Sequence, residues 1–516
     1  MPSVADTLLI AVDHQRAGRT AAAGAIYRDV LQAEPGQPQA LYLHGLLDLA
    51  AGRADHAATL LARAVEARPS HAGARLALAR ARLDAGQKGG ALDAATTALA
   101  LDPSQAEAHF LLGTALSALG RTEEAIASLL QAVARQPRHA AAHLNLGNAW
   151  ADLDRFEEAE RFCRAAIALD PALAEAHASL GFILTSSGRL AEAVAACDAA
   201  IALRPDFAEA HWNRAVACLL AGDFAAGFAG CEWRKRHRRF HGGLPDLPGP
   251  SWMGEDLTGR TILVRAEQGL GDTIQLSRYL PCLAALGARV RLVCDARLIP
   301  LLRTLPGAVE IAAREAPLPP HDLWVDQMSL PRLFATTSET VPAPSGYLQA
   351  DPAWAAAWRA TLPDGPRIGL VWAGNPAHAN DRRRSLPPGT LAPLLEIPGL
   401  HFVSLQLGPR AAETADMPGV IDPTARLADY AATAALVAAL DLVITVDTSV
   451  AHLAGGLGRP VWVMLPFAPD WRWMLGSDSS PWYGSMRLFR QERPGYWRGV
   501  VARVAEALRT APPHAA

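Results

Sequence analysis

The chain has 516 residues, of which half are apolar and 19% are charged, a composition typical of globular domains and unlike that of a disordered chain. At about 150 residues per domain, this length predicts about three domains. The formal net charge of −3 gives no general attraction to nucleic acid or to an anionic membrane, so neither is expected as a partner. The two lysines, Lys88 and Lys235, form no Gly-Lys pair, which excludes a P-loop.

The N-terminus and the cysteines indicate a soluble protein of a reducing compartment. The first apolar stretch, Leu8–Val12, is short for a signal peptide and runs directly into Asp13. No apolar run reaches the ~20 residues that a membrane-spanning helix needs. Six cysteines without a C-x-x-C pair do not make a disulfide framework. We therefore expect a cytoplasmic protein without a membrane span.

The first half of the chain repeats every 34 residues. Prolines and glycines keep this step in the columns Pro35, Pro69, Pro103, Pro137, Pro171 and Pro205, and Gly18, Gly52, Gly86, Gly120, Gly188 and Gly222. Asp154 fills the vacant glycine position. The pattern predicts two antiparallel helices per unit, with a glycine turn between them and a proline after the second. It resembles the tetratricopeptide repeat family, with six full repeats over about residues 4–207 and a seventh that decays after about residue 225.

Two further columns of the repeat concern histidine and cysteine. His109, His143, His177 and His211 are again 34 residues apart, a spacing that suggests either metal binding or packing. Successive repeats lie roughly 10 Å apart, too far for these side chains to share an ion held at ~2 Å, so packing is favoured. Cys163 and Cys197 share another column, and we interpret them as small core residues.

Three asparagines are the expected contacts to a bound peptide. In the resembled family the positions of Asn145 and Asn213 face the groove that holds an extended peptide, and Asn148 lies one helical turn beyond Asn145. An asparagine ladder of this kind binds peptide backbone in the O-GlcNAc transferases, which these positions resemble. Ordinary solvated polar residues are the alternative.

A concentration of positive charge ends the repeats. Residues 234–239 include four arginines, Lys235 and His237, and two interpretations stay open: a solvated helix end before a linker, or an anion-binding patch. We assign residues 1–240 to the repeat domain and the Gly- and Pro-rich residues 241–258 to a linker.

The second half alternates short β-rich apolar runs with helical stretches, which predicts parallel sheets of α/β type. The predicted strands are Thr261–Ala266, Arg289–Cys294, Leu323–Val325, Ile368–Ala373, Phe402–Leu407, Leu442–Val446 and Val461–Leu465. A proline-rich stretch and a predicted helix over Pro352–Leu362 divide this half into an N-terminal lobe (259–350), a connection (351–366) and a C-terminal lobe with a terminal helix (367–512). Two Rossmann-like lobes facing a cleft describe a GT-B fold, among others.

Two predicted strands each end in a polar turn that starts a helix. The first turn contains Gly269, Gly271 and Asp272, where glycine lets a ligand approach the backbone and the helix start favours negative charge. Asp272 is either a functional carboxylate or a helix cap. The second turn runs from Asp447 to His452 and offers hydroxyls and N–H groups to a phosphate; a helix cap and a core histidine are the alternative.

Together the two turns resemble the bacterial heptosyltransferase family, from about Gly259 to near Val500. The resemblance implies that Asp272 is the catalytic base. It also implies that Asp447, Thr448 and His452 hold the phosphates and sugar of the donor, with Ser449 where the family usually has glycine.

A third segment of the C-terminal lobe adds to this resemblance. Arg384 stands where the family has a lysine that contacts the donor, and arginine can face phosphate with two donors at once. The segment from Asn375 to Ser385, and the Glu267-Gln268 pair, are instead similar to bacterial glycosyltransferases linked to tetratricopeptide repeats. Acceptors in that group are expected to be proteins.

The expected architecture is therefore multidomain, with an α-helical tetratricopeptide solenoid followed by an α/β GT-B fold of two Rossmann-like lobes. The expected function is inverting transfer of a sugar from a nucleotide-activated donor to Ser or Thr of a protein in the groove. A base removes the acceptor proton, and positive charge stabilises the leaving phosphate. Some flagellin glycosyltransferases share this layout, so flagellin is one candidate acceptor.

No cofactor and no catalytic metal are expected, because the Asp-x-Asp of this chain, Asp152–Asp154, lies inside a repeat turn. Trp471, Trp473 and Trp482 follow the last predicted strand, and either stack on a base or sugar or pack in the core. Two alternative functions remain. One is a repeat scaffold whose transferase half is inactive, and the other is a transferase acting on lipopolysaccharide or exopolysaccharide.

Overall fold

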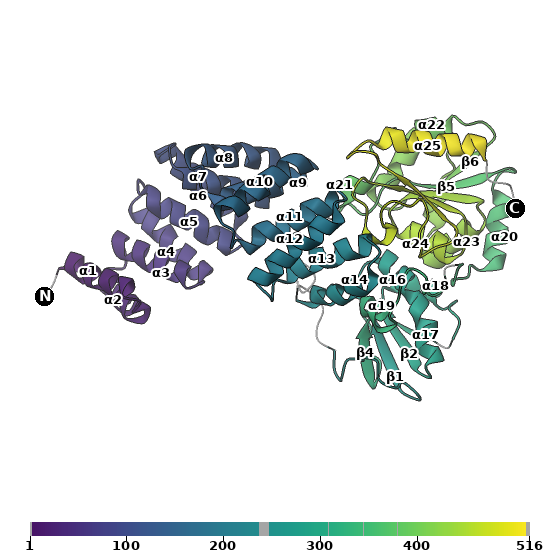
Figure 1. Cartoon of the computed structure of the whole chain (residues 1–516), viewed down its shortest axis with the longest axis horizontal. Helices are drawn as coiled ribbons and strands as arrows, with labels where there is room; N and C mark the ends of the chain where they lie inside the picture. Colours follow the sequence, from purple (N-terminus) through teal and green to yellow (C-terminus); the bar gives the residue numbers. More distant parts are fainter. Residues whose placement is uncertain (1–2, 237–246, 308, 344, 379, 512–516) are drawn as a thin grey trace. The chain divides into compact units, whose positions relative to one another are not determined.

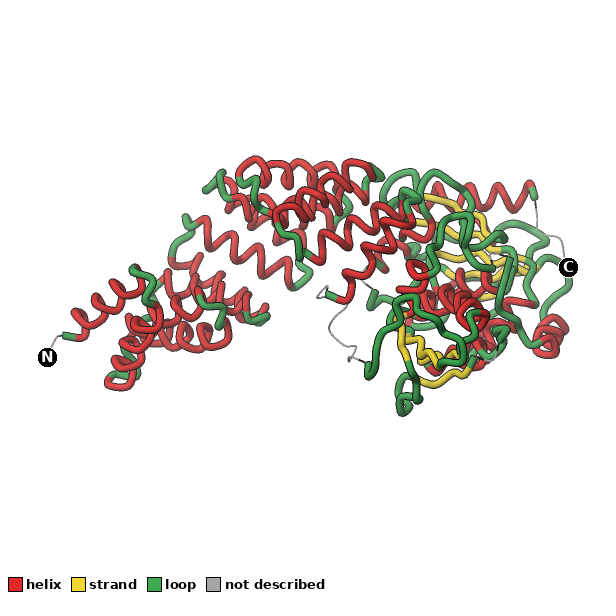
Figure 2. The backbone as a smooth tube through the Cα atoms, turned by 60° about the horizontal axis from the view of Figure 1, so that its bottom comes forward, coloured by secondary structure: helices red, strands yellow, loops and turns green. Residues whose placement is uncertain are grey.

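The computed structural model describes residues 3–236, 247–307, 309–343, 345–378 and 380–511. Paired helices make up the first part of the chain, and strands bordered by helices make up the second (Figure 2). By internal packing the chain forms two compact units: residues 1–183 with 202–204, and residues 184–201 with 205–516. No helix in the described residues is both long enough and apolar enough to cross a membrane.

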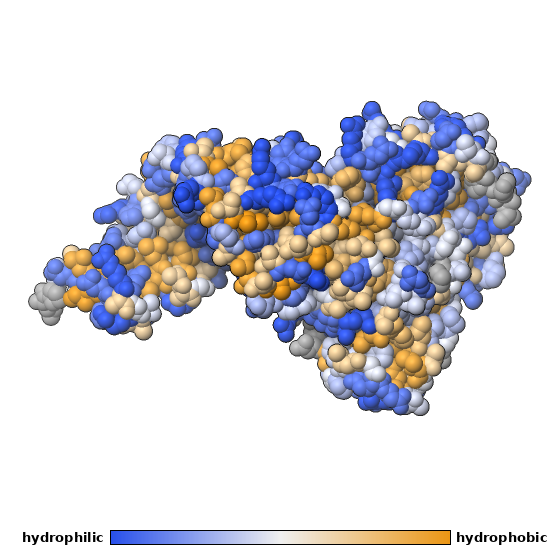
Figure 3. Space-filling view, viewed as in Figure 1, coloured by the Kyte–Doolittle hydropathy of each residue, from blue (hydrophilic) through white to orange (hydrophobic). Residues whose placement is uncertain are grey.

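The repeat helices are antiparallel pairs, as the period predicts. In the described residues their bounds are α1 Val4–Arg16, α2 Thr20–Ala33, α3 Pro38–Ala50, α4 Ala54–Ala67, α5 Ala72–Asp84, α6 Lys88–Leu101, α7 Ala106–Ala118, α8 Thr122–Arg135, α9 Ala140–Asp152, α10 Phe156–Leu169, α11 Ala174–Ser186, α12 Leu190–Leu203, α13 Ala208–Leu220 and α14 Phe224–Cys231. The eight-residue α14 is the decaying end of the seventh pair. On the face drawn in Figure 3, hydrophobic and hydrophilic residues alternate over these alanine-rich helices.

Small residues set the distance between the two helices of a repeat. A Cβ atom added to Gly45 or to Gly113 would lie 2.6 Å from Cγ of Leu61 or Leu129, so each glycine permits the close approach of its partner helix. Cys163 occupies the equivalent position against Gly147. Cys163 and Cys197 are fully buried, and burial raises the pKa of both thiols to about 12, which confirms that they are small core residues.

The histidines of the 34-residue column form hydrogen bonds to the loop that precedes the first helix of each repeat. The Nε2 atoms of His109, His143, His177 and His211 donate to the carbonyl of the proline six residues earlier, at 3.2, 3.0, 3.1 and 2.9 Å. Each ring therefore packs on the loop that connects its repeat to the preceding one. Among the described residues, no group of three His, Cys, Asp or Glu side chains is placed to hold a metal ion.

The turn inside each repeat uses left-handed backbone. The six column glycines have φ between 73° and 86°, and Asp154, in the remaining turn, has φ 61°. Glycine adopts this region without a steric cost, whereas a side chain there is strained.

Replacing Asp154 with glycine should therefore stabilise the first compact unit by about 0.5–1 kcal/mol, because the strain of a side chain in left-handed backbone is removed. Thermal unfolding of the full chain measures this gain. Gly120→Asp is the matched control, since it introduces the same strain one repeat earlier and should lower the melting temperature. A lower melting temperature for Asp154→Gly would contradict the assignment of strain.

The α/β half contains two parallel sheets with the strand orders β3-β2-β1-β4 and β6-β5-β7-β8-β9. The described strands are β1 Thr261–Arg265, β2 Arg289–Cys294, β3 Glu310–Ala313, β4 Leu323–Asp326, β5 Arg367–Val371, β6 His401–Ser404, β7 Leu442–Val446, β8 Val461–Leu465 and β9 Met486–Arg490. Every ladder is parallel, as predicted, with Ile262 opposite Val290 and Ile368 opposite Leu442, for example. The two sheets form the centres of two Rossmann-like lobes (Figure 1).

The α-helices of this half, within the described residues, are α16 Leu270–Leu276, α17 Leu280–Ala285, α18 Ile299–Leu302, α19 Leu330–Leu333, α20 Pro352–Thr361, α21 Asp381–Arg384, α22 Ala392–Leu395, α23 Tyr430–Ala438, α24 Ser449–Gly456 and α25 Trp497–Thr510. Short 3₁₀ turns also occur, including η1 Glu232–Lys235, η4 Gln327–Ser329 and η7 Trp471–Trp473. The predicted helix over Pro352–Leu362 is present as α20.

One buried hydrophobic cluster joins the last repeat helices to both lobes. Phe228 of α14 packs edge-on against Trp471 and Trp482, with ring centres 5.7 and 6.3 Å apart. The predicted repeats decay after about residue 225, but α13 and α14, with residues 184–201, belong to the compact unit of the α/β half. The sequence-based domain boundary at residue 240 and the boundary between compact units therefore differ.

The segment predicted as a linker, residues 241–258, is partly outside the described residues, which resume at 247. The second part of this segment pairs with the N-terminal lobe and is therefore not a free linker. Trp252 is buried and its N–H donates to the carbonyl of Trp324 (2.7 Å), so the segment extends the sheet beyond β4.

Candidate functional site

The two polar turns predicted from the sequence meet where the lobes meet. Helix α16 follows β1, helix α24 follows β7, and the two helices pack against each other in the second unit. A Cβ atom on Gly271 would lie 2.8 Å from Cδ2 of His452 and 3.3 Å from Cα of Ser449, so glycine is required for this approach. Carboxyl ends of parallel strands are where ligands bind in open α/β folds.

Asp272 uses its two carboxylate oxygens differently. Oδ2 accepts a hydrogen bond from the N–H of Gly269 (2.9 Å), which is the helix-capping role. Oδ1 accepts from Nη2 of Arg472 in the other lobe. The carboxylate keeps a quarter of its accessible surface. The cap interpretation is therefore right for one oxygen, while the other takes part in an ion pair between the lobes.

Arg472 is a central residue of this site that the sequence did not reveal. Its Nε donates to Oε1 of Gln275 (2.6 Å) and its Nη1 donates to Asp470 (2.7 Å). The guanidinium lies 4.3 Å from the ring centre of Trp471. Arg472 is almost fully buried, and the carboxylates of Asp272 and Asp470 compensate its charge.

His452 is held as a neutral imidazole. It is 4% exposed, its Nδ1 lies 2.9 Å from the hydroxyl of Tyr483, and its ring stacks on Trp473. Burial, followed by the positive charges of Arg472 and other arginines, holds the pKa of His452 well below its usual value. A neutral histidine can offer one hydrogen bond to a ligand but adds no positive charge.

The hydroxyl groups at the start of α24 are already engaged within the protein. Thr448 Oγ1 lies 3.1 Å from Thr445 Oγ1, and Ser449 Oγ lies 2.6 Å from the hydroxyl of Tyr430. The first N–H groups of any helix lack intrahelical partners, so the helix start still offers donors to an anion.

Arg384 and Ser385 lie where the loop after β5 folds back. The N–H of Gly374 donates to Oγ of Ser385 (3.0 Å), and a Cβ atom on Gly374 would come within 2.6 Å of the Arg384 guanidinium. Arg384 also donates to Asp381 (3.3 Å). Asn375 is exposed, and its Oδ1 accepts from the N–H of Ala377 (3.0 Å) to close the turn.

Asp447, at the end of β7, is close to several of these charges. Its pKa is raised to about 6, because burial and the neighbouring carboxylate of Asp470 disfavour ionisation, while Arg384 opposes the rise. The carboxylate therefore takes up a proton more readily in the folded chain than in the unfolded one. The stability that this proton provides is complete below about pH 4 and is lost as the pH rises through about 6.

Replacing Asp447 with asparagine should stabilise the α/β half at pH 7.5 by about 2 kcal/mol, after allowance for residual solvent access. The gain should shrink as the pH falls through 6 and vanish below about pH 4, where the wild-type carboxyl group becomes protonated in the unfolded state as well. Melting temperatures of both proteins across this pH range measure the effect. A difference in melting temperature between Asp447→Asn and wild type that does not change with pH would contradict the raised pKa of Asp447.

The three tryptophans are core residues. Trp471, Trp473 and Trp482 are at most 3% exposed, so of the two alternatives the structure favours core packing. Arg234 also differs from expectation, because it is 2% exposed rather than solvated. The remainder of the charge run from residue 237 lies outside the described residues.

The three asparagines belong to different compact units. Asn145 of α9 donates to Thr114 Oγ1 of α7 (2.9 Å), and the exposed Asn148 lies one turn further along α9. Asn213 lies on α13 in the second unit. Only Asn145 and Asn148 are thus brought to one surface of a single unit.

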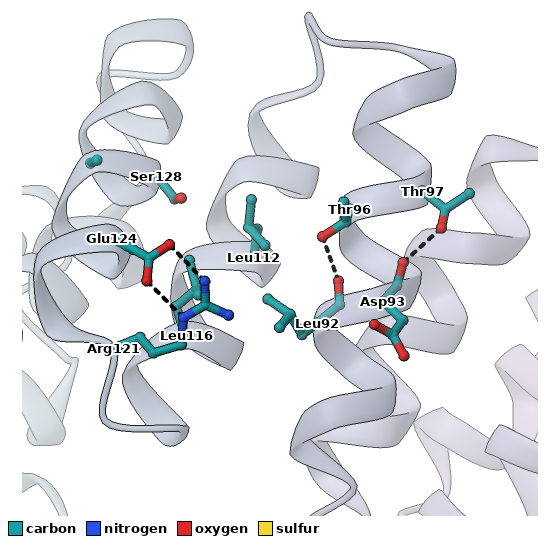
Figure 4. A pocket seen from close by; sticks show the side chains of 10 residues that line it. Leu92, Asp93, Thr96, Thr97, Leu112, Leu116, Arg121, Glu124 and Ser128 are labelled. Atoms are coloured by element: carbon teal, nitrogen blue, oxygen red, sulfur yellow. Dashed lines mark hydrogen bonds and ion pairs between the residues drawn. The ribbon is translucent and has the colours of Figure 1, made fainter.

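A pocket of about 740 Å³ opens between α6 and α8 (Figure 4). Leucines line its floor, and threonines, a serine and the Arg121–Glu124 ion pair surround it; the lining residues are Leu92, Asp93, Thr96, Thr97, Leu112, Leu116, Arg121, Glu124, Ala127 and Ser128. Leu112 and Leu116 are on the opposite side of α7 from Thr114, since two residues correspond to about 200° of helix turn. The pocket and Asn145, which contacts Thr114, therefore occupy different faces of the repeats.

Comparison with known proteins identifies the repeats. The Tetratricopeptide repeat model matches residues 8–72, 76–131 and 110–174, and the TPR repeat model matches residues 183–222. The N-terminal half is therefore a tetratricopeptide repeat array, followed by an α/β region with parallel sheets.

Protein FlbA of Caulobacter vibrioides is 35% identical over 314 residues, covering 54% of this chain and 52% of FlbA. The chain thus spans about half the length of this curated relative. Among solved structures, a thermophilic TPR protein of Thermus thermophilus is 30% identical, with a TM-score of 0.32 over 35% of this chain and 99% of that one. MamA of Desulfovibrio magneticus is 23% identical, with a TM-score of 0.31 over 33% of this chain and 96% of MamA.

Proposed function

We propose that the α/β half is a glycosyltransferase that moves a sugar from a nucleotide-activated donor to Ser or Thr of a protein acceptor. The observation that carries this proposal is the meeting of two helix starts, α16 and α24, at the carboxyl ends of β1 and β7. A carboxylate, Asp272, stands at this junction. The resemblance to heptosyltransferases and repeat-linked glycosyltransferases supports the same assignment.

The groups at the junction suit an inverting transfer. The helix start of α24 and Arg384 would bind the donor phosphates, with a hydrogen bond from His452. Asp272 would take the proton of the acceptor hydroxyl as the oxygen attacks the anomeric carbon. Positive charge near the departing phosphate stabilises the leaving group. Arg472 would fix the orientation of the Asp272 carboxylate by donating to its Oδ1 from the opposite lobe.

The repeat array is proposed to hold the acceptor. Tetratricopeptide arrays present an extended surface to peptides, and Asn145 and Asn148 offer amide groups on one such surface. Flagellin is the acceptor suggested by the two-part layout. The reaction is proposed to take place in the cytoplasm, with no metal or cofactor.

Titration calorimetry of the full chain with a panel of nucleotides and sugar nucleotides in EDTA tests the donor site. We expect binding without divalent metal, weakened at least tenfold in Arg384→Gln and unchanged in Arg382→Gln, a neighbouring arginine on the exposed side of α21. Strict dependence on magnesium or manganese would contradict the metal-free proposal. Absence of nucleotide binding would favour the inactive scaffold.

The acceptor is identified by intact-mass spectrometry of candidate proteins from cells with and without the gene. A mass increase of one or more sugar residues on a protein, lost with the gene, is the expected result. A change confined to lipopolysaccharide or exopolysaccharide would favour the polysaccharide alternative.

A further inference from the structure

The single 3₁₀ turn after the last repeat helix inserts an arginine into the N-terminal lobe. Arg234 of η1 is 2% exposed, and the Nη2 and Nε atoms of its guanidinium donate to Oε1 of Glu267 at 2.8 and 3.2 Å. Nη2 also donates to Oγ of Ser329 (3.0 Å), and Nη1 donates to the carbonyl of Cys231 and to Glu232, both at 3.1 Å. A side chain of the repeat end is thus fully hydrogen-bonded inside the α/β half.

Glu267 lies in the segment that leads to the proposed catalytic carboxylate. It lies two residues after the end of β1 and two residues before Gly269, whose N–H donates to Asp272. Its Oε1 also accepts from the N–H of Met328, which follows β4 (3.2 Å). Arg234 and Glu267 therefore tie the end of the repeats to the turn that presents Asp272.

The ion pair is buried among further charges. The side chain of Glu267 is 5% exposed, and Asp326 lies 4.0 Å from the Arg234 guanidinium. Asp326 is also paired with Arg265 (2.7 Å) and lies 3.7 Å from Lys235. Without Arg234, the carboxylate of Glu267 would lose its strongest partner in a buried site, which should destabilise the turn that follows Glu267.

We propose that Arg234 is a positioning residue for sugar transfer: through Glu267 it holds the turn from Gly269 to Asp272. The end of the repeat array is then part of the transfer machinery. This inference rests on the proposed function. A pair with only a structural role could be replaced by apolar residues of similar volume without loss of turnover, whereas a positioning role could not.

The test compares Arg234→Met with the double variant Arg234→Met/Glu267→Met. In the single variant we expect kcat to fall about tenfold or more, with nucleotide affinity within threefold of wild type. The double variant leaves no unpaired buried charge, so its melting temperature should recover toward wild type while kcat stays low. Recovery of kcat together with the melting temperature, or wild-type kcat in the single variant, would overturn the proposal.

Lys235→Met is the matched control: it also removes a positive charge near Asp326 (3.7 Å), but Lys235 is 42% exposed and pairs with Glu232 rather than with Glu267. It should leave kcat and melting temperature close to wild type. Hydrogen exchange of residues 266–276 supplies a readout independent of activity. Faster exchange in Arg234→Met than in Lys235→Met would support the role of Arg234 in holding this turn. Equal exchange in the two variants would overturn the inference. Absence of sugar transfer by the wild-type protein would contradict only the proposed function.

Discussion

Replacing Asp272 with asparagine should lower sugar transfer by about 10²–10⁴-fold, the usual contribution of a general base. The asparagine keeps the size of the side chain and an oxygen that can accept from Gly269, but it has no basicity. Nucleotide affinity should stay within a few-fold of wild type, since the proposed contacts to the donor phosphates come from the other lobe. Single-turnover transfer and calorimetric titration of the folded variant measure the two quantities.

The ion pair with Arg472 makes a control necessary, because asparagine also removes a negative charge from that guanidinium. Asp470→Asn is the matched variant: it removes another carboxylate from Arg472 (2.7 Å) and leaves Asp272 in place. We expect turnover within a few-fold of wild type for Asp470→Asn. An equal loss in both variants would show that the effect acts through Arg472, and a rate near wild type for Asp272→Asn would remove Asp272 from the mechanism.

Truncating Phe228 to alanine should destabilise the α/β half by about 3–5 kcal/mol, although the residue belongs to the last repeat helix. Its ring is 1% exposed and packs against Trp471 and Trp482, so the truncation opens a cavity beneath the C-terminal lobe. Scanning calorimetry of the full chain should show a lower transition temperature for the compact unit that contains both lobes.

Phe110→Ala is the matched control for this prediction. Phe110 is equally a buried phenylalanine of a repeat helix, but it lies on α7 in the first compact unit. Its truncation should lower the unfolding temperature of that unit and leave the transition of the α/β half unchanged. The division of the chain into these units would be contradicted if Phe110→Ala shifted the transition of the α/β half and Phe228→Ala that of the first unit. The same shift of both transitions in both variants would also contradict it.

The regular parts of this protein were predictable because their patterns are local. The repeat helices follow from columns of glycine, alanine and proline, and seven strands follow from apolar runs or from turn signals. Strands β3 and β9 were missed because Glu310–Ala313 is short and half-exposed, and Met486–Arg490 has arginine at two of its five positions and no long apolar run.

Only the residues of the candidate site that lie in recognisable motifs could be predicted from the sequence. The turns at Gly271 and His452 could be found from sequence, and the parallel topology brings them together. Arg472 could not be found, because it pairs with a carboxylate 200 residues away and lies in no recognisable motif. Arg234 was hidden by its neighbours, since a run of positive charge usually indicates a solvated surface.

The bond between each histidine and the proline carbonyl six residues before it has a consequence for how such an array changes over generations. Each of these bonds joins the proline that ends one repeat to a histidine in the first helix of the next, and the same pair of residues recurs at successive repeat boundaries. Duplication or deletion of one 34-residue unit in the gene leaves each remaining loop with its own histidine and proline. The number of repeats, and with it the length of polypeptide that the array can span, can therefore change in whole units while every joint keeps its geometry.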